Sequence, residues 1–126
     1  MKILAVVQSA YRTLVEEQDD TILWLNQTIQ KAGANISILL MGHTCSYAVQ
    51  KAPLPLLQIG TWQQVAPASV VDDMNRLHNA GIPVYVIAEE LNCRGLHAAD
   101  LNPGVLVIAQ TQVANLYDAA DQVWHW

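Results

Sequence analysis

The segment from Gly81 to Leu96 constrains the fold more than any other part of the sequence, because an apolar run there ends abruptly in polar residues. The run follows Gly81-Ile82-Pro83, is rich in β-branched residues and does not alternate with polar ones. Such a run is typical of a strand that is covered on both faces of a parallel sheet. Because side chains converge at the carboxyl ends of parallel strands, we expect a binding crevice where this strand ends. The polar residues at that end are Glu89, Glu90, Asn92, Cys93 and Arg94.

Strands and helices are predicted to alternate along most of the chain. Further strands are expected at residues 3–7, 36–41, 105–109 and 122–126, with helical patterns between most of them. This alternation predicts an α/β fold, a three-layer α/β/α sandwich with a five-stranded, mostly parallel sheet and a flavodoxin-like appearance. The length of 126 residues suits a single domain that spans residues 1–126.

Capping residues predict where the helices begin and end. Thr13 and Ser69 each precede an acid three residues on, the signature of a capping box, and Gly33 and Gly81 end the two helical patterns. A third helix is predicted to open at Thr111. The apolar faces of the three helices are Ile22, Leu25, Ile29 and Ala32; Val70, Met74 and Leu77; and Val113, Leu116 and Tyr117. Short helical segments are also expected at residues 48–51 and within residues 96–101.

Composition and charge exclude several classes of function. The hydrophobic fraction of 52% against 13% charged residues is high for a soluble monomer and predicts burial against other subunits. A net charge of −5 leaves no basic stripe for nucleic acid, and no apolar stretch is long enough to cross a membrane. The apolar core of the N-terminal segment is too short for a signal peptide, so we expect a cytoplasmic protein. Its two cysteines, Cys45 and Cys93, are then read as free thiols.

The segment 52–62 is apolar but is broken by Pro53 and Pro55. Two prolines this close fit neither the interior of a helix nor a central strand. We therefore expect a loop that packs against another part of the protein or against another subunit. It would be either a lid over the strand ends or, as we favour for so apolar a segment, a patch buried between subunits.

Several motifs of catalysis and cofactor binding are absent from the sequence. There is no Walker loop, no G-x-S-x-G elbow, and no G-x-G-x-x-G after the first strand, where Gln8-Ser9-Ala10-Tyr11 is too bulky to admit a pyrophosphate. No cofactor and no metal are therefore expected. The acidic cluster near the first predicted helix is interpreted as a solvated helix start, where the helix dipole favours negative charge: Glu16, Glu17, Asp19 and Asp20.

The predicted strand ends carry two thiols that are candidates for nucleophilic chemistry. Cys93 precedes Arg94 and is expected near the start of a short helical turn, and both a cation and a helix N-terminus stabilise a thiolate. Cys45 follows His43 closely, and a protonated imidazole would act in the same way. The alternative for each cysteine is a small semi-buried apolar residue without chemistry. The residues predicted to bind ligand around the thiols are Gln8, Ser9, Tyr11, His43, Glu89, Glu90 and Asn92.

Two other readings of these polar residues stay open. If the second and third strands are neighbours, His43, Cys45, Cys93 and His97 would supply the donor types that zinc prefers, although the spacing is not a known zinc signature. Glu89 and Glu90 would serve as a general acid and base, or would cap a helix and pair with a nearby arginine.

Parts of the chain resemble the DsrE/DsrF-like family, which includes YchN-like proteins and TusD sulfur-relay subunits. The resemblance rests on Ile82 to Ile87, on Cys93-Arg94-Gly95-Leu96, on Leu101-Asn102-Pro103-Gly104-Val105 and on Ala119 to Trp124, and it extends back through Leu39-Leu40-Met41-Gly42 to Lys2-Ile3-Leu4-Ala5-Val6-Val7. It implies a three-layer α/β/α fold, assembly into trimers, hexamers or hetero-oligomers, and cytoplasmic sulfur transfer. In this family a cysteine at the end of the third strand carries sulfur as a persulfide.

This chain departs from the family at the carrier position. When Arg94-Gly95-Leu96 is aligned with the family's Arg-Gly-aliphatic step, the carrier cysteine falls on Ile87 or, in some members, on Glu90. We therefore expect a sulfur-relay role through Cys93, with Arg94 assisting and Cys45 as a second route. The alternative is a non-catalytic oligomeric scaffold or a subunit that binds a partner or a small ligand, using the 53–62 segment and the Trp124-His125-Trp126 end.

Overall fold

The main sheet has five strands, all paired in parallel, in the order β6-β5-β2-β1-β7. A computed structural model describes residues 1–9, 21–50, 56, 58–65 and 69–126 of the chain. The strands span Lys2–Val7 (β1), Asn35–Leu40 (β2), Val84–Ile87 (β5), Val105–Ile108 (β6) and Gln122–His125 (β7). The predicted α/β class and five-stranded sheet are thus confirmed.

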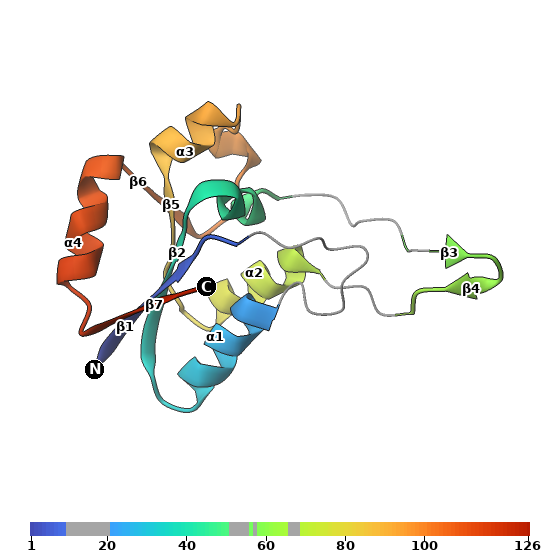
Figure 1. Ribbon diagram of the computed structural model, residues 1–126, viewed down its shortest axis with the longest axis horizontal. Helices are drawn as coiled ribbons and strands as arrows, with labels where there is room; N and C mark the ends of the chain where they lie inside the picture. The colour runs from blue at the N-terminus through green and yellow to red at the C-terminus, as the bar shows by residue number, and fades with distance from the viewer. Residues whose placement is uncertain (10–20, 51–55, 57, 66–68) are drawn as a thin grey trace.

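Helices cover both faces of this sheet and make a three-layer α/β/α sandwich (Figure 1). On one face lie α1 (Thr21–Lys31) and α2 (Val70–Asn79), and on the other lies α4 (Val113–Asp118). The side chains of β1 alternate between the two layers. Ile3, Ala5 and Val7 join the buried cluster under α1 and α2, whereas Leu4 and Val6 join the cluster under α4. The absence of polar residues from β1 is therefore explained by burial on both faces.

The predicted helix start at Ser69 and the helix ends before Gly33 and Gly81 are confirmed. The helix predicted to open at Thr111 begins instead at Val113, because Thr111 lies in a 3₁₀ helix, η3 (Gln110–Gln112). The Ser69 side chain accepts a hydrogen bond of 3.2 Å from the backbone N–H of Asp72 at the start of α2, as the capping signal predicted. Gly33 follows α1 with φ +102, a left-handed conformation that glycine adopts without strain. The expected helix start at Thr13 and the acidic cluster at 16–20 lie outside the described residues.

The connection after β2 differs from its prediction. A 3₁₀ helix, η1, spans Gly42–Ala48, and the helix predicted at 48–51 is wrong for Val49 and Gln50. Val49 instead forms an antiparallel bridge with Leu101, and the Gln50 N–H donates to the carbonyl of Asp100 at 2.8 Å. These long-range backbone bonds replace the local ones that a helix requires. A second 3₁₀ helix, η2 (Ala98–Asp100), confirms the helical turn expected within 96–101.

The segment predicted as a proline-broken loop contains a short hairpin. Two-residue strands, β3 (Gln58–Ile59) and β4 (Trp62–Gln63), pair antiparallel around Gly60, and the hairpin extends away from the sheet and its helices (Figure 1). Ile59 and Trp62 face each other across the hairpin, and both side chains are exposed. Strands of two residues are too short for an alternating pattern to reveal them. Pro53 and Pro55 lie outside the described residues.

Within the described part of the chain, no helix has the length and apolar character that crossing a bilayer requires.

Candidate functional site

The carboxyl ends of β1 and β2 are joined by the buried hydroxyl of Thr44. Its Oγ1 lies within hydrogen-bonding distance of the carbonyl oxygens of Val7 and Met41, at 2.7 Å from the latter, and can donate to one of them at a time. The Met41 N–H also donates to the Val7 carbonyl at 3.0 Å. Thr44 therefore fixes η1 over the end of the sheet. Sequence reasoning missed this residue, because Val7 is distant in sequence and no local pattern connects the two.

A short helix, α3, spans Ala88–Cys93 and begins directly where β5 ends. Cys93 is its last residue, so the prediction that Cys93 lies near a helix start is wrong. Ile87 occupies the N-cap position without a side-chain cap, and the first turn carries Glu89 and Glu90. The helix N-terminus that was expected beside Cys93 therefore lies at the other end of α3.

Glu90 and Arg94 form a half-buried ion pair one helical turn apart. Arg94 Nη1 donates to the Glu90 carboxylate at 2.7 Å and to the Glu90 carbonyl at 3.0 Å. The pairing of a glutamate with Arg94, one of the alternatives drawn from the sequence, is thus confirmed for Glu90. Because Glu90 offsets the charge of Arg94, this cation acts on the Cys45 thiol together with an opposite charge.

Cys45 lies in η1, is buried, and is influenced by the same ion pair. Burial raises the pKa of the Cys45 thiol above its usual value, the Arg94 guanidinium lowers this pKa, and the Glu90 carboxylate raises it, with burial the largest effect. His43, expected to activate this thiol, is not among the groups that shift the pKa of Cys45, and its side chain is exposed. The site therefore favours a protonated Cys45 at neutral pH.

The remaining predicted binding residues lie around this centre without forming one cluster. The backbone N–H groups of Gln8 and Ser9 donate to the Trp126 carbonyl at 3.0 and 3.3 Å, which joins the ends of β1 and β7. Glu89 accepts a hydrogen bond of 2.8 Å from the Gln110 N–H, at the 3₁₀ helix η3 (Gln110–Gln112). Asn92 is exposed. Tyr11 lies outside the described residues.

The structure thus brings together some of the predicted residues and separates others. Cys45, Glu90 and Arg94 form one group at the carboxyl ends of β2 and β5, and Cys93 is exposed at the end of α3. The described residues contain no group of three or more His, Cys, Asp or Glu side chains that could hold a metal ion. The soft-metal site considered for His43, Cys45, Cys93 and His97 is therefore not formed.

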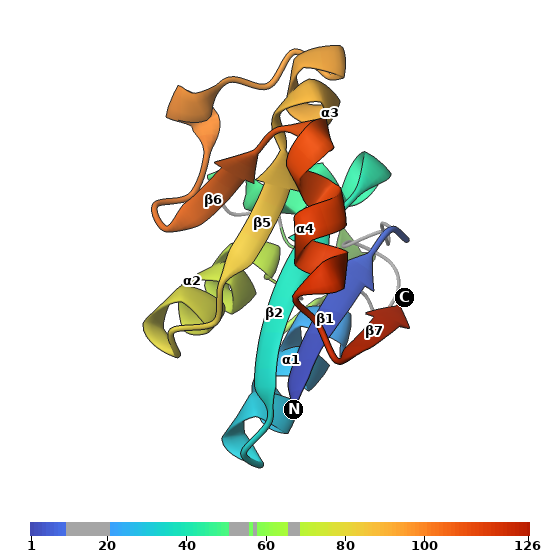
Figure 2. The ribbon, with the colours of Figure 1, turned by 90° about the vertical axis from the view of Figure 1, so that its left-hand side faces the viewer.

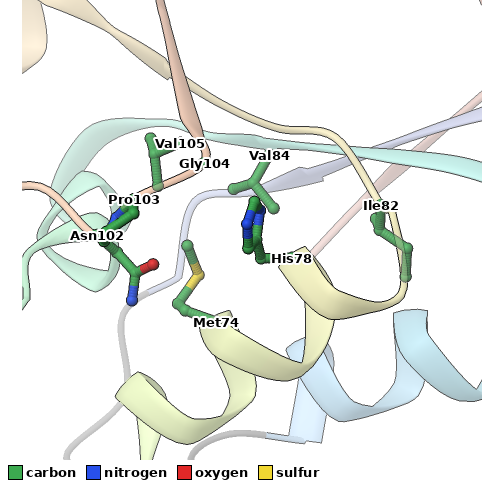
Figure 3. Close-up of a pocket in the computed structure, with 8 residues that line it drawn as sticks. All are labelled: Met74, His78, Ile82, Val84, Asn102, Pro103, Gly104 and Val105. Atoms are coloured by element: carbon green, nitrogen blue, oxygen red, sulfur yellow. The ribbon is translucent and has the colours of Figure 1, made fainter.

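A small pocket lies at the opposite end of the strands from this group (Figure 3). It is lined by Val84 and Val105, the first residues of β5 and β6, and by Met74 and His78 of α2. Buried Asn102 closes one side, where its Nδ2 donates to Asn75 Oδ1 at 3.1 Å. Because the predicted site residues follow the carboxyl ends of the strands, this pocket is separate from them.

Comparisons with solved structures identify the fold as DsrE-like. The YchN protein of E. coli superposes with a TM-score of 0.75 over 99% of this chain and 98% of its own, at 16% sequence identity. MTH1491 of Methanobacterium thermoautotrophicum, described as a protein of unknown function, superposes with a TM-score of 0.64 over 98% of this chain and 97% of its own, at 11% identity. No protein-family profile and no curated protein matches the sequence. At these identities the likeness concerns the fold alone.

Proposed function

We propose that this protein is a DsrE-like sulfur-relay subunit that accepts sulfane sulfur on Cys93. The observation that carries the proposal is the exposure of Cys93 on the helix that directly follows the interior strand β5, since a relay thiol must be reached by both a donor and an acceptor. The other cysteine of the chain, Cys45, is buried. The resemblance of the sequence to the DsrE/DsrF-like family, in which a cysteine carries sulfur, supports the same chemistry, and the likeness to YchN supports the fold on which that chemistry would take place.

The transfer that we propose is a thiol exchange without net oxidation. The Cys93 thiolate attacks the outer sulfur of a donor persulfide, the new S–S bond forms as the donor's own S–S bond breaks, and the donor leaves as a thiolate. An acceptor thiolate then removes the outer sulfur in the same way. The family's two carrier positions are occupied here by Ile87, which is fully buried, and by Glu90, which is paired with Arg94. A carrier cysteine in this chain would therefore lie at a different position from the family's, as Cys93 does.

Intact-mass measurement after treatment with a persulfide donor tests this function. The native protein and a Cys45→Ser variant should each gain the mass of one sulfur atom, and Cys93→Ser should gain none. Release of the added sulfur by a small thiol would identify it as a persulfide. Native protein that gains no sulfur would exclude the proposal.

A non-catalytic subunit that assembles through the hairpin is the second candidate function. Leu56, Ile59, Trp62 and Val65 expose 43%, 65%, 54% and 93% of their surface, and apolar side chains this exposed are typical of a contact surface. A homotrimer or homohexamer is the expected assembly. Under this alternative, an Ile59→Ser, Trp62→Ser double variant loses the assembly while retaining the fold, and a native protein that stays monomeric and retains no partner excludes it.

A further inference from the structure

Among the residues that the structure describes, strand β6 is an unpaired edge of the sheet, with exposed apolar side chains on both of its faces. Its pairing with β5 places Val107 beside Val86, on the face covered by α1 and α2, and Ile108 beside Ile87, on the face covered by α4. Leu106 shares the face of Ile108, because alternate residues of a strand point the same way. Leu106 and Val107 each expose 45% of their surface. Figure 2 shows β6 at the margin of the sheet, beyond the strands that α4 covers.

This edge carries few of the features that normally prevent strands from pairing between molecules: Pro103 precedes β6, and the Glu89 carboxylate accepts from the Gln110 N–H beyond its end. Isolated edges are usually protected by charged side chains, by proline or by a bulge. Residues 101–116 contain no Asp, Glu, Lys, Arg or His, and β6 itself contains no proline. The opposite edge strand, β7, differs: it follows Asp121 and contains His125.

We propose that β6 pairs antiparallel with β6 of a second copy of this chain about a twofold axis, which joins two sheets into one of ten strands. A second copy is the occupant that fits this edge, because its own β6 is an uncharged apolar strand of the same length. Each chain carries a net charge of −5, so a stable self-contact must keep the acids of the two copies apart. Antiparallel pairing of β6 places segment 109–112 of one copy beside segment 102–105 of the other, and neither contains an acid. The Glu89 carboxylate, which accepts from the Gln110 N–H, would therefore lie beside the uncharged segment 102–105 of the other copy.

The sequence of β6 also selects the register of this pairing. A twofold axis perpendicular to the sheet keeps each face continuous, so a residue can lie opposite only residues of its own face. Centring the axis on Val107 pairs Val107 with its own copy, Leu106 with Ile108 and Val105 with Ala109, all of them apolar. Centring it on Leu106 would pair Ile108 with Gly104, which offers no side chain to pack. The register centred on Val107 is therefore preferred.

Sedimentation and cross-linking test this pairing on the full-length chain. Val107→Lys should raise the dissociation constant of the assembly by about tenfold or more, because it places two ammonium groups face to face. Gln122→Lys, which adds the same charge to exposed edge strand β7, should leave that constant unchanged. In a Cys93→Ser background, Val107→Cys should form an interchain disulfide on mild oxidation, because residues opposite each other in an antiparallel pair lie within disulfide distance. Val105→Cys should not.

Four results would overturn the proposal. The first is a native protein that is monomeric at every concentration tested or that assembles only as a trimer, and the second is an assembly that Val107→Lys does not weaken. The third is cross-linking through Val105→Cys in place of Val107→Cys. The fourth is co-purification with a different protein that protects the β6 amides from hydrogen exchange. The proposal goes beyond sulfur transfer and the hairpin contact. Sulfur loading on Cys93 and the Ile59→Ser, Trp62→Ser variant report on those functions without involving β6, so each hypothesis can fail alone.

Discussion

The imidazole of His78 lies directly against Gly104. A Cβ built on Gly104 would fall within 2.8 Å of His78 Cγ and nearer still to Nδ1, which is closer than non-bonded atoms approach. Gly104 also has φ +94, a conformation that costs little only for glycine. Because His78 belongs to α2 and Gly104 directly precedes β6, this contact fixes the start of the edge strand against the helix layer (Figure 3).

Gly104→Ala should lower the free energy of unfolding by about 1 to 2 kcal/mol, mostly because it adds a left-handed alanine; the exposed His78 ring adds only the part of the clash that it does not relieve by turning aside. In a His78→Ala background the same change should cost only the backbone part, about 1 kcal/mol. Urea denaturation of the four proteins measures both costs as a double-mutant cycle. Equal costs of Gly104→Ala in the two backgrounds would contradict the steric role of His78.

Thr44 should contribute to stability through its buried hydroxyl, which donates to the Val7 carbonyl at the end of β1 or to the Met41 carbonyl just after β2. Thr44→Val preserves the shape of the side chain and removes the hydroxyl, so we expect a loss of about 1 to 2 kcal/mol in the free energy of unfolding. Thr28 provides a matched control, because its exposed hydroxyl donates to the Trp24 carbonyl at 3.0 Å within α1. Thr28→Val should change that free energy by less than about 0.5 kcal/mol. Losses of the same size at the two positions would argue against a special role for Thr44.

The features predicted correctly from the sequence are those that short-range patterns determine. Uninterrupted apolar runs identified β1, β5 and β6. Burial on both faces explains the missing polar residues in β1 and β5, whereas the apolar residues of β6 remain partly exposed. The Ser69 cap was predictable because its partner is close in sequence: the Asp72 N–H lies within the same helical turn.

The errors concern features without a local signal. Helix α3 begins immediately after Ile87, which offers no capping side chain, so nothing in the sequence showed that Cys93 ends a helix rather than starting one. The hydrogen bond between Thr44 and Val7 and the bridge between Val49 and Leu101 depend on tertiary contacts between distant segments. The functional roles of Cys93, Arg94 and Cys45 stay predictions that chemical experiments must test.

Stability should fall at alkaline pH because of Cys45. Burial raises the pKa of its thiol in the folded protein, so as pH rises past the ordinary thiol value of 9.0 the unfolded chain loses its proton first. The contribution of the neutral thiol is thus fully present below that value and is lost as pH rises toward the folded pKa. The difference in free energy of unfolding between native protein and Cys45→Ala, measured in urea from pH 7 to pH 10, should shrink over this range. A constant difference would contradict the prediction.

Arg94 should set the upper limit of this pH range. Its guanidinium lowers the pKa of the Cys45 thiol, so Arg94→Gln should raise that pKa further and extend the loss of stability to higher pH. The exposed cation of Lys31 provides a control, because Lys31→Gln removes the same charge from the last turn of α1. Its pH profile should match that of the native protein. Arg94→Gln and Lys31→Gln profiles that coincide would show that Arg94 does not act on Cys45.

The two thiols should differ sharply in their reactivity toward a disulfide reagent such as Ellman's reagent. Cys93 is exposed and should react within the first phase at pH 8, whereas Cys45 is fully buried and reacts only when η1 opens locally, so its rate should be at least about 100-fold lower. Cys93→Ser should abolish the fast phase, Cys45→Ser should preserve it, and both thiols of the native chain should react at once in concentrated urea. A fast phase that survives Cys93→Ser would mean that Cys45 is accessible in the folded protein, and the assignment of the relay thiol would then pass to Cys45.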